Sequence, residues 1–513
     1  MFRSLRNVRR LLDIARLLAR HDALFALELL NVAPAVVALA RLMSRRDAEG
    51  RPGQRLARAL NEAGPSFIKL GQILATRSDV LGEDLAADLS DLQDSLPPFP
   101  AAEARAAIAE EFDEPVEALF QSFDDEPVAA ASIAQVHFAV TTDGREVAVK
   151  VLRPEIEEAF ARDLDLLQWG ADMIERALPE LRRLKPRELV ETLAASVEME
   201  MDLRFEAAAA AEMAENFEGD ADFRVPEIDW GRTGQRVMTT ARIYGVSLDD
   251  VDGIVAAGHD PLEITARAAR ATFRQIFRDG FFHADVHPGN LFVTEDGIIA
   301  AVDFGIMGRI DIRTRRILGE MLLAFLTRDF RRAAEIHFEA GWVPADRSVD
   351  AFTQACRSIA EPILDKPQNE ISIGRLLGQL FRITETFQME TQPQLLLLQK
   401  TMLVAEGTAR KLSPDANMWV LARPLIEEWM EDTLGPEARV RVAVEGIARA
   451  VDKLPRVIEG LEESASLIAD GRVRLHPETI KQLRRDSRGG GIGASLWFAA
   501  IFLLVLTVII RFG

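Results

Sequence analysis

The chain has 513 residues, of which 48% are hydrophobic, and its formal net charge at pH 7 is −20. This length exceeds what a single hydrophobic core holds, so we expect two or three folded units. The acidic balance, without a large basic stretch, excludes nucleic acid as a partner, and the single cysteine excludes an internal disulfide or a cysteine-based zinc site.

Residues 1–105 are predicted to form a helical extension. Leu85, Leu89 and Leu92 recur at helical spacing, and a proline-rich segment at 97–100 ends the pattern. The basic, leucine-rich N-terminus predicts an amphipathic helix, and a helix lying on a membrane surface is the alternative interpretation.

Residues 106–245 have the pattern of a small β-rich lobe. Two runs of strand character flank the turn signal at Asp143 and Gly144, which predicts a hairpin. A helical segment over 155–215 follows, and strand character returns at 236–240.

Residues 246–345 are predicted to form a mainly helical lobe that contains a second hairpin around Gly297. A helical region follows over 346–485. A β-rich lobe followed by a helical lobe is an arrangement in which a nucleotide can bind in the cleft between them.

The C-terminus predicts a membrane anchor. After a glycine-rich linker at 486–493, residues 494–511 form an almost wholly apolar run that is long enough as a helix to cross a bilayer. Basic residues precede the run and only Arg511 lies at its far end, so the positive-inside rule predicts a single pass through the inner (cytoplasmic) membrane with the catalytic body in the cytoplasm. A buried C-terminal helix is the alternative.

Three elements, in order along the chain, predict phosphoryl-transfer chemistry. Lys150 ends an alternating strand, from which a kinase lysine holds nucleotide phosphates and pairs with a helix glutamate. Asp285 and Asn290 have the spacing of a kinase catalytic loop, and Asp303 begins a DFG sequence thirteen residues later. We interpret Asp285 as the catalytic residue that orients or deprotonates the acceptor, and Asn290 and Asp303 as magnesium ligands.

Small residues replace the usual glycine-rich phosphate loop, about eighteen positions before Lys150. Alanine adds a Cβ atom where glycine allows close approach of the backbone to phosphate, and Ser132 restores one hydrogen-bond donor. We expect nucleotide binding by Lys150 and by the loop residues Ala129, Ala130, Ala131, Ser132, Ile133, Ala134, Gln135 and Val136.

Three other residues could carry chemistry but have plainer interpretations. His283 and His287 flank Asp285, and we expect them to pack in the loop or to bond to a backbone carbonyl, with metal ligation as the alternative. Cys356 is expected to be a small buried apolar residue.

Together these motifs resemble the UbiB-type atypical protein-kinase-like family over about residues 60–310. The KLGQ sequence at 69–72 is similar to the signature of that family's N-terminal extension, as are the segments at 76–79, 89–94 and 97–99. The resemblance implies an α+β, bilobal protein-kinase-like fold with an N-terminal helical extension, additional C-terminal helices and a C-terminal transmembrane helix. It also implies ATP or ADP and Mg²⁺ as cofactors.

In this family the extension covers the cleft where a protein substrate would lie. Glu200 and Asp202 would bond to the extension, and Lys150 would pair with Glu206. Lys69 is expected to contact the motif carboxylates or the nucleotide, because a buried lysine needs a partner. The resemblance thus implies a regulatory or structural motif made of Lys69, Gly71, Gln72, Glu200, Asp202 and Glu206.

The resemblance implies a membrane-anchored ATPase-like or kinase-like enzyme that supports ubiquinone biosynthesis and acts on or senses a lipid or small-molecule intermediate. Its partners would be membrane lipid and quinone-biosynthesis intermediates or enzymes. The segment 238–242 departs from the family because it lacks a glutamate at the hinge, which bears on nucleotide selectivity. A nucleotide-binding pseudokinase scaffold is the second hypothesis. A polyprenylphenol hydroxylase is the third, and it is disfavoured because the sequence shows no Rossmann fingerprint, haem ligand arrangement or iron triad.

Overall fold

The computed structural model describes most of the chain up to residue 430, and all described residues belong to one compact unit, Met1–Met430. The described ranges are 2–25, 50–75, 85, 88–89, 96–177, 186–364, 383–384, 386–389, 393–414 and 424–430. The predicted linker, the predicted transmembrane helix at 494–511 and the signature residues at 76–79 and 91–94 lie outside these ranges.

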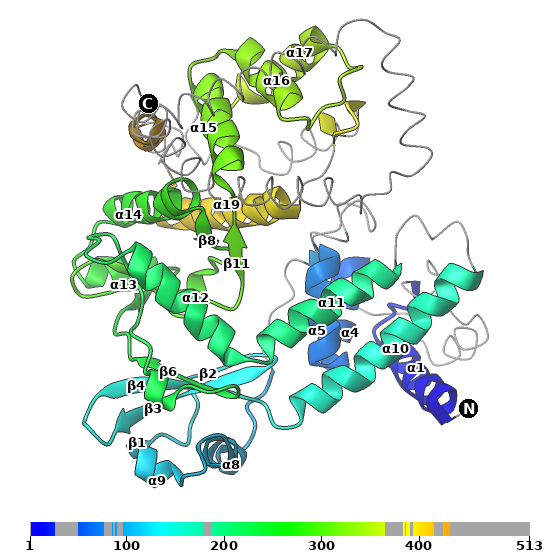
Figure 1. Cartoon of the computed structure of the whole chain (residues 1–513), viewed down its shortest axis with the longest axis vertical. Coiled ribbons are helices and arrows are strands. Elements are labelled where there is room, and N and C mark those ends of the chain that lie inside the picture. The colour runs from blue at the N-terminus through cyan, green and yellow to red at the C-terminus, as the bar shows by residue number, and fades with distance from the viewer. Residues whose placement is uncertain are drawn as a thin grey trace, which may run out of the picture. The chain divides into compact units, whose positions relative to one another are not determined.

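The N-terminal extension is a group of helices with its own core. Buried Leu11, Leu56 and Phe67 pack together with Leu166 of the long helix that follows the small lobe. The apolar face of the first helix is therefore covered by protein, in agreement with the amphipathic-helix interpretation. Figure 1 shows these helices, in blue, beside two helices that follow the hairpin of the small lobe. They are α1 (Phe2–Arg20), α4 (Pro52–Ala63) and α5 (Pro65–Ala75), next to α10 (Ile156–Ala177) and α11 (Pro186–Glu200).

The small lobe is an antiparallel sheet with strand order β1-β3-β4-β6 and with β2 paired to β3. The predicted hairpin is present, since β3 and β4 are adjacent and Gly144 in their turn has a φ of +86°, which favours glycine. Its strands are β1 (Phe120–Phe123), β2 (Ala129–Ala130), β3 (Ala134–Thr141), β4 (Glu146–Leu152) and β6 (Val237–Ala241).

The two faces of β4 have different roles. Val147, Val149 and Val151 are buried in a core that includes Ile108 of helix α8 (Ala101–Phe112). Because side chains alternate along a strand, Lys150 lies on the opposite face. The alternation of the sequence therefore directs the lysine away from the α8 core.

The predicted helical segment 155–215 is divided into three helices, with a break between Glu200 and Asp202, which we call the acidic motif. α11 ends at Glu200, and α12 (Leu203–Asn216) begins after Asp202. The Asp202 side chain accepts a hydrogen bond from the Arg204 backbone N–H and so caps α12. This cap sets the start of the helix that carries Glu206.

The larger lobe joins small sheets to helices, and it contains the second predicted hairpin. β9 and β10 pair across the turn at Gly297, whose φ is +76°. The helix that begins at Pro261 is α-helical to Phe273 and continues as a π-helical turn, Arg274–Asp279. The elements are β5 (Phe223–Arg224), β7 (Val246–Ser247), α13 (Val251–Ala256), α14 (Pro261–Phe273), β8 (Phe281–His283), β9 (Leu291–Val293), β10 (Ile299–Ala301) and β11 (Met307–Arg309).

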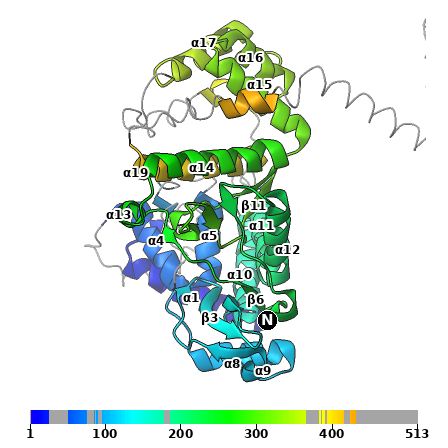
Figure 2. The same cartoon turned by 90° about the vertical axis from the view of Figure 1, so that its left-hand side faces the viewer.

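Helices follow the larger lobe. Figure 1 and Figure 2 both show the last of them, α19, lying along α14, which it contacts. Cys356 is buried, and burial raises its pKa to about 12, as expected for an apolar packing residue. Across the described ranges, no helix has both the length and the apolar character needed to span a bilayer. These helices are α15 (Ile312–Leu326), α16 (Phe330–Glu339), α17 (Val349–Ala360) and α19 (Pro393–Leu412).

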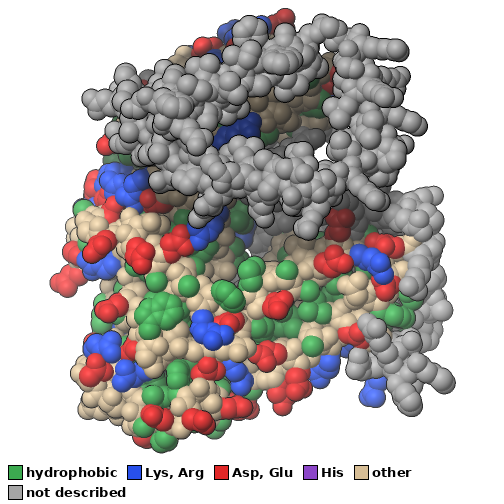
Figure 3. All heavy atoms as spheres, viewed as in Figure 1, with side chains coloured by type: hydrophobic (Ala, Val, Ile, Leu, Met, Phe, Trp, Pro, Cys, Tyr) green, Lys and Arg blue, Asp and Glu red, His purple; other side chains and the backbone are tan. Residues whose placement is uncertain are grey.

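The surface of the described residues mixes charges of both signs. On the face drawn in Figure 3, acidic and basic side chains alternate over the small lobe and the neighbouring helices. Many arginines of the described residues form ion pairs with nearby carboxylates, such as Arg105 with Asp125 at 2.8 Å and Arg309 with Glu212 at 2.5 Å.

Candidate active site

Lys150 joins the small lobe to the larger lobe through two carboxylates. Its Nζ lies 2.7 Å and 2.8 Å from the two carboxylate oxygens of Glu206 on α12, which is the predicted pairing. The same Nζ lies 3.4 Å from Asp303 Oδ2. The side chains of Lys150 and Glu206 are only 14% and 8% exposed. The sheet, α12 and the DFG segment therefore meet at a single buried ammonium group.

The electrostatics of this group keep Lys150 and Asp303 charged, whereas burial raises the pKa of Glu206. Burial alone disfavours the charge on Lys150, but the carboxylates of Asp303 and Glu206 outweigh burial and raise its pKa. Burial likewise opposes ionisation of Asp303, yet Lys150, the Gly305 N–H, His283 and Lys69 together lower the pKa of Asp303 to about 2. Asp303 is thus an anion at neutral pH.

His283 connects the catalytic loop to the DFG segment. Its Nδ1 accepts a hydrogen bond from the backbone N–H of Asp285, 3.1 Å away, so Nε2 carries the proton and donates to the carbonyl of Asp303. Burial lowers the pKa of His283, which keeps the ring neutral and suits this tautomer. The bond from His283 to a backbone carbonyl is the one that was predicted, whereas His287 is exposed and accepts a hydrogen bond from the Gly289 N–H.

The other two residues of the predicted catalytic loop, Asn290 and Asp285, are held by different contacts. Asn290 accepts a hydrogen bond at its carbonyl from the N–H of Val302, at 3.0 Å, which places it beside Asp303. Asp285 is half-buried, and its Oδ1 lies 3.1 Å from Nζ of Lys400 on α19. Reasoning from the sequence missed this lysine, because 115 residues separate it from Asp285.

The alanine-rich loop is held closed by Arg153. The guanidinium donates to the carbonyl of Ala131 at 2.8 Å and to that of Leu96 at 3.3 Å, and it lies 5.5 Å from the ring centre of Phe99.

The residues of this loop lie beside Lys150. Ala129 and Ala130 form β2, while Ile133 and Ala134 belong to the main core. Val136 lies opposite Lys150 in the β3–β4 pair, so the loop adjoins the lysine, as predicted.

Two polar side chains of this loop are fully covered. Gln135 bonds to both the N–H and the carbonyl of Phe99 and contacts His137, which ties the loop to the proline-rich segment. The hydroxyl of Ser132 is buried, and no hydrogen-bond partner for it is found among the described residues. Burying a hydroxyl without a hydrogen-bond partner costs free energy, so a bound group that forms a hydrogen bond with Ser132 can offset that cost.

The extension is fastened to the acidic motif by one of its predicted contacts. Lys69 Nζ lies 2.8 Å from Glu200 Oε2, with side chains 9% and 11% exposed, so the expected contact with a motif carboxylate is confirmed. Gly71 is buried and Gln72 half-buried. The expectation for Asp202 was wrong: its carboxylate is occupied by the α12 cap and by Arg204, 2.7 Å away. Its position at the helix start explains this, because a cap must face the helix N–H groups.

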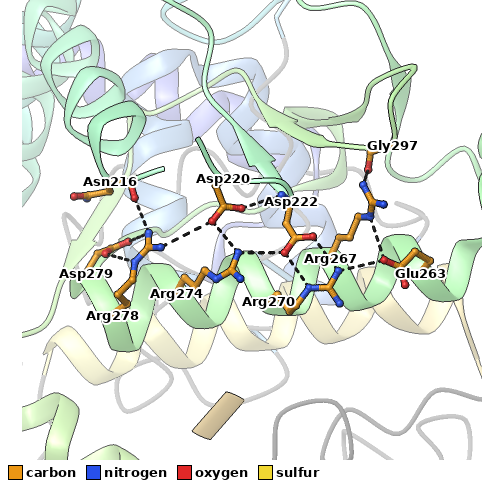
Figure 4. Close-up of polar contacts among 10 residues, drawn as sticks. All are labelled: Asn216, Asp220, Asp222, Glu263, Arg267, Arg270, Arg274, Arg278, Asp279 and Gly297. Atoms are coloured by element: carbon orange, nitrogen blue, oxygen red, sulfur yellow. Dashed lines mark hydrogen bonds and ion pairs between the residues drawn. The ribbon is translucent and has the colours of Figure 1, made fainter. Parts of the chain in front are cut away.

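Figure 4 shows four arginines along α14 and its π-helical continuation, three of which bind the end of α12 or the aspartates that follow it. Arg278 donates to the Asn216 carbonyl where α12 ends, and Arg270 holds both oxygens of Asp222 at 2.9 Å. Hydrogen bonds from Arg270 lower the pKa of Asp222. The sequence shows that these arginines recur every three or four residues, on one face of a helix, but it does not show which carboxylates they bind. The arginines are Arg267, Arg270, Arg274 and Arg278.

These residues suit a magnesium–nucleotide group. Within the described part of the chain, no cluster of three or more His, Cys, Asp or Glu side chains forms a metal site of its own. Magnesium at phosphate sites, however, takes one or two protein ligands and completes its shell with phosphate and water. Ionised Asp303 and Asn290, whose backbone adjoins that of the DFG segment, supply that donor set.

Comparison with known proteins gives two family matches. Residues 91–337 match the ABC1 atypical kinase-like domain, which includes the whole bonded framework around Lys150. Residues 356–417 match the UbiB helical domain, which includes α19 and Lys400.

Curated relatives and a solved structure agree with these matches. A "Probable protein kinase UbiB" from Aeromonas salmonicida is 40% identical and aligns with 90% of this chain and 86% of its own length. A protein of the same name from Vibrio cholerae is 40% identical over 89% of this chain and 85% of its own length. A structure described as a complex of Rv3197 with erythromycin, from Mycobacterium tuberculosis, has a TM-score of 0.52 and 26% identity, covering 72% of this chain and 93% of that one.

Proposed function

The chain belongs to the UbiB family of atypical kinase-like proteins, and from that premise we propose that it is a membrane-anchored, ATP-dependent enzyme that supports ubiquinone biosynthesis. Its substrate would be a lipid or small-molecule intermediate. The observation that carries the proposal is the bonded framework of Lys150, Glu206 and Asp303, with the catalytic loop tied to it through His283.

Each residue of this framework has a role that follows from its contacts. Lys150, held by Glu206, presents its ammonium group to the nucleotide phosphates. Asp303 and Asn290 would hold Mg²⁺, which neutralises phosphate charge when bound. Asp285 accepts the proton of the attacking hydroxyl, and His283 keeps the loop that carries Asp285 beside Asp303.

The extension bears on the kind of acceptor. Lys69 is bound to Glu200 in a nearly buried pair, and it is close enough to Asp303 to help lower the pKa of that carboxyl. A segment fixed so near the DFG aspartate restricts access by a folded protein. We therefore propose a small or lipidic acceptor, in preference to a protein side chain.

Anchoring in the membrane is part of the same proposal. It rests on the apolar run at 494–511 and on the basic residues that precede it. A lipid acceptor would meet an anchored enzyme at the bilayer surface, so the two parts of the proposal support each other.

A scaffold that binds nucleotide without turnover is the second candidate. The nearly buried Lys69–Glu200 pair favours it, because a permanently covered site restrains chemistry. The retained carboxylates at 285 and 303 favour an enzyme, since a scaffold has no need of an acceptor-side aspartate.

The test is ATP turnover by the purified full chain, with and without phenolic lipid or membrane vesicles, beside an Asp303→Asn variant. We expect turnover that rises with lipid and a loss of Mg²⁺-dependent ATP affinity of at least tenfold, about 1.4 kcal/mol, in Asp303→Asn. Tight nucleotide binding without any turnover would favour the scaffold. Equal Mg²⁺-dependent binding in both proteins would remove Asp303 from the metal site.

A further inference from the structure

A single ion pair connects the helical region after the kinase-like domain to the catalytic aspartate. Lys400 Nζ on α19 lies 3.1 Å from Asp285 Oδ1. The lysine belongs to the segment that matches the UbiB helical domain, whereas the aspartate belongs to the kinase-like domain. The two matched domains therefore meet at Asp285, the residue proposed to accept the proton of the attacking hydroxyl.

Packing on both sides of Lys400 fixes its position. One turn before it, Leu397 packs against the core cluster that contains Ala284. One turn after it, Val404 packs against the cluster that contains Val286. The neighbours of Asp285 in sequence thus belong to the same cores as the neighbours of Lys400, so the ammonium group is directed to this place by the fold.

The pair is open to solvent, unlike the pair at Lys150. The side chains of Lys400 and Asp285 are 41% and 36% exposed, whereas those of Lys150 and Glu206 are 14% and 8% exposed. An exposed pair contributes little to stability because water screens it. The Lys400 ammonium can consequently exchange the carboxylate for another anion at small cost.

The catalytic loop itself supplies no lysine or arginine to the acceptor side of the site. The sequence from Asp285 to Asn290 contains no lysine or arginine, and buried Ala284 precedes it. Lys150 and Lys69, the two lysines that help to lower the pKa of Asp303, are each bound to a nearly buried glutamate. Charge that develops on a transferring phosphoryl group needs positive groups around it.

We propose that Lys400 is a phosphate-binding residue of the active site, which contacts the terminal phosphate of the bound nucleotide and in doing so releases the Asp285 carboxylate to the acceptor hydroxyl. This inference rests on the proposed nucleotide-dependent function. It makes the helical region an integral part of the active site.

The test compares affinities for a non-hydrolysable ATP analogue and for ADP, each with Mg²⁺, in full-chain Lys400→Met and Lys400→Arg. We expect Lys400→Met to weaken binding of the ATP analogue about tenfold, or about 1.4 kcal/mol, and to change ADP affinity less than about twofold. Lys400→Arg keeps the charge and should restore most of the loss. Lys411→Met, at an exposed position of the same helix, is the matched control and should bind both nucleotides as the wild type does.

Unchanged affinity for the ATP analogue, or an equal loss for both nucleotides, would overturn the inference. So would a rise in ATP turnover with unchanged affinity, because Lys400 would then restrain Asp285 without binding phosphate. Lys400→Gln replaces Lys400→Met if the latter does not fold. Asp303→Asn is measured in parallel: if it also binds and turns over ATP normally, the proposed function itself fails, whereas a normal result in the Lys400 variants alone removes only this inference.

Discussion

The two sides of the candidate site are built from the same chemistry in different surroundings. On the nucleotide side, Lys150 and Glu206 are nearly buried, and both oxygens of the glutamate bind the ammonium group. On the acceptor side, Lys400 and Asp285 form a single contact that is more than one-third exposed. Burial makes the first pair a fixed structural element, while exposure leaves the second pair free to rearrange with substrate.

The extension resembles the nucleotide side in this respect. The Lys69–Glu200 pair is as well covered as the Lys150–Glu206 pair. The ion pairs of the site are therefore of two kinds, fixed and exchangeable. Which kind a pair is does not depend on whether it lies within the kinase-like domain or joins that domain to the extension or to α19.

Removing the ammonium group of the fixed pair is expected to have the largest effect. Lys150→Met leaves Glu206 and Asp303 without their cation, so we expect a loss of about 3 kcal/mol in the free energy of unfolding and loss of nucleotide binding. Urea unfolding of both proteins, monitored by circular dichroism, measures the first quantity.

A double variant sharpens this result. Glu206→Gln added to Lys150→Met removes the uncompensated charge, so stability should recover in part while nucleotide binding stays lost. Lys150→Met with wild-type stability would show that the pair is not a fixed element of the structure.

Loss of the extension contact should have the next largest effect. Lys69→Ala leaves Glu200 nearly buried and unpaired, at a cost of about 2 kcal/mol, and should loosen the cover of the site. We expect autophosphorylation to rise and rescue of quinone synthesis to fall in cells that depend on this protein. Arg58→Ala, at an exposed position of α4, is the control. Wild-type behaviour of Lys69→Ala in both assays would remove the extension from the mechanism.

The smallest effect is expected in the alanine-rich loop. Ala130→Gly relaxes a short strand that pairs with Gln135, and we expect the ratio of ATP to ADP affinity to change by about threefold. Titration with each nucleotide measures the ratio. Ala106→Gly in α8 should lower stability without changing that ratio, and an unchanged ratio in Ala130→Gly would place phosphate recognition elsewhere.

Much of this site could be predicted because its parts are local in sequence. The strand that ends at Lys150, the spacing from Asp285 to Asn290 and the hairpin before Asp303 each occupy a short window with a clear pattern. The pairing of Lys150 with Glu206 came from family resemblance and is present in the structure.

The contacts that escaped prediction are those between distant segments. Lys400 and Arg153 have ordinary helical and loop surroundings in the sequence, and only packing of the folded chain brings them to Asp285 and Ala131. The error at Asp202 had a local cause, since its role as the α12 cap competed with its expected role in holding the extension.

The most direct test of the account is Asp285→Asn in the full chain, because this change leaves the fixed pair intact and removes the acceptor-side base together with the charge that pairs with Lys400. We expect Mg²⁺-dependent affinity for ATP to stay within about twofold of the wild type while turnover falls at least about a hundredfold. Turnover that equals the wild-type rate would contradict the assignment of Asp285 and with it the division of the site into a fixed nucleotide side and an exchangeable acceptor side.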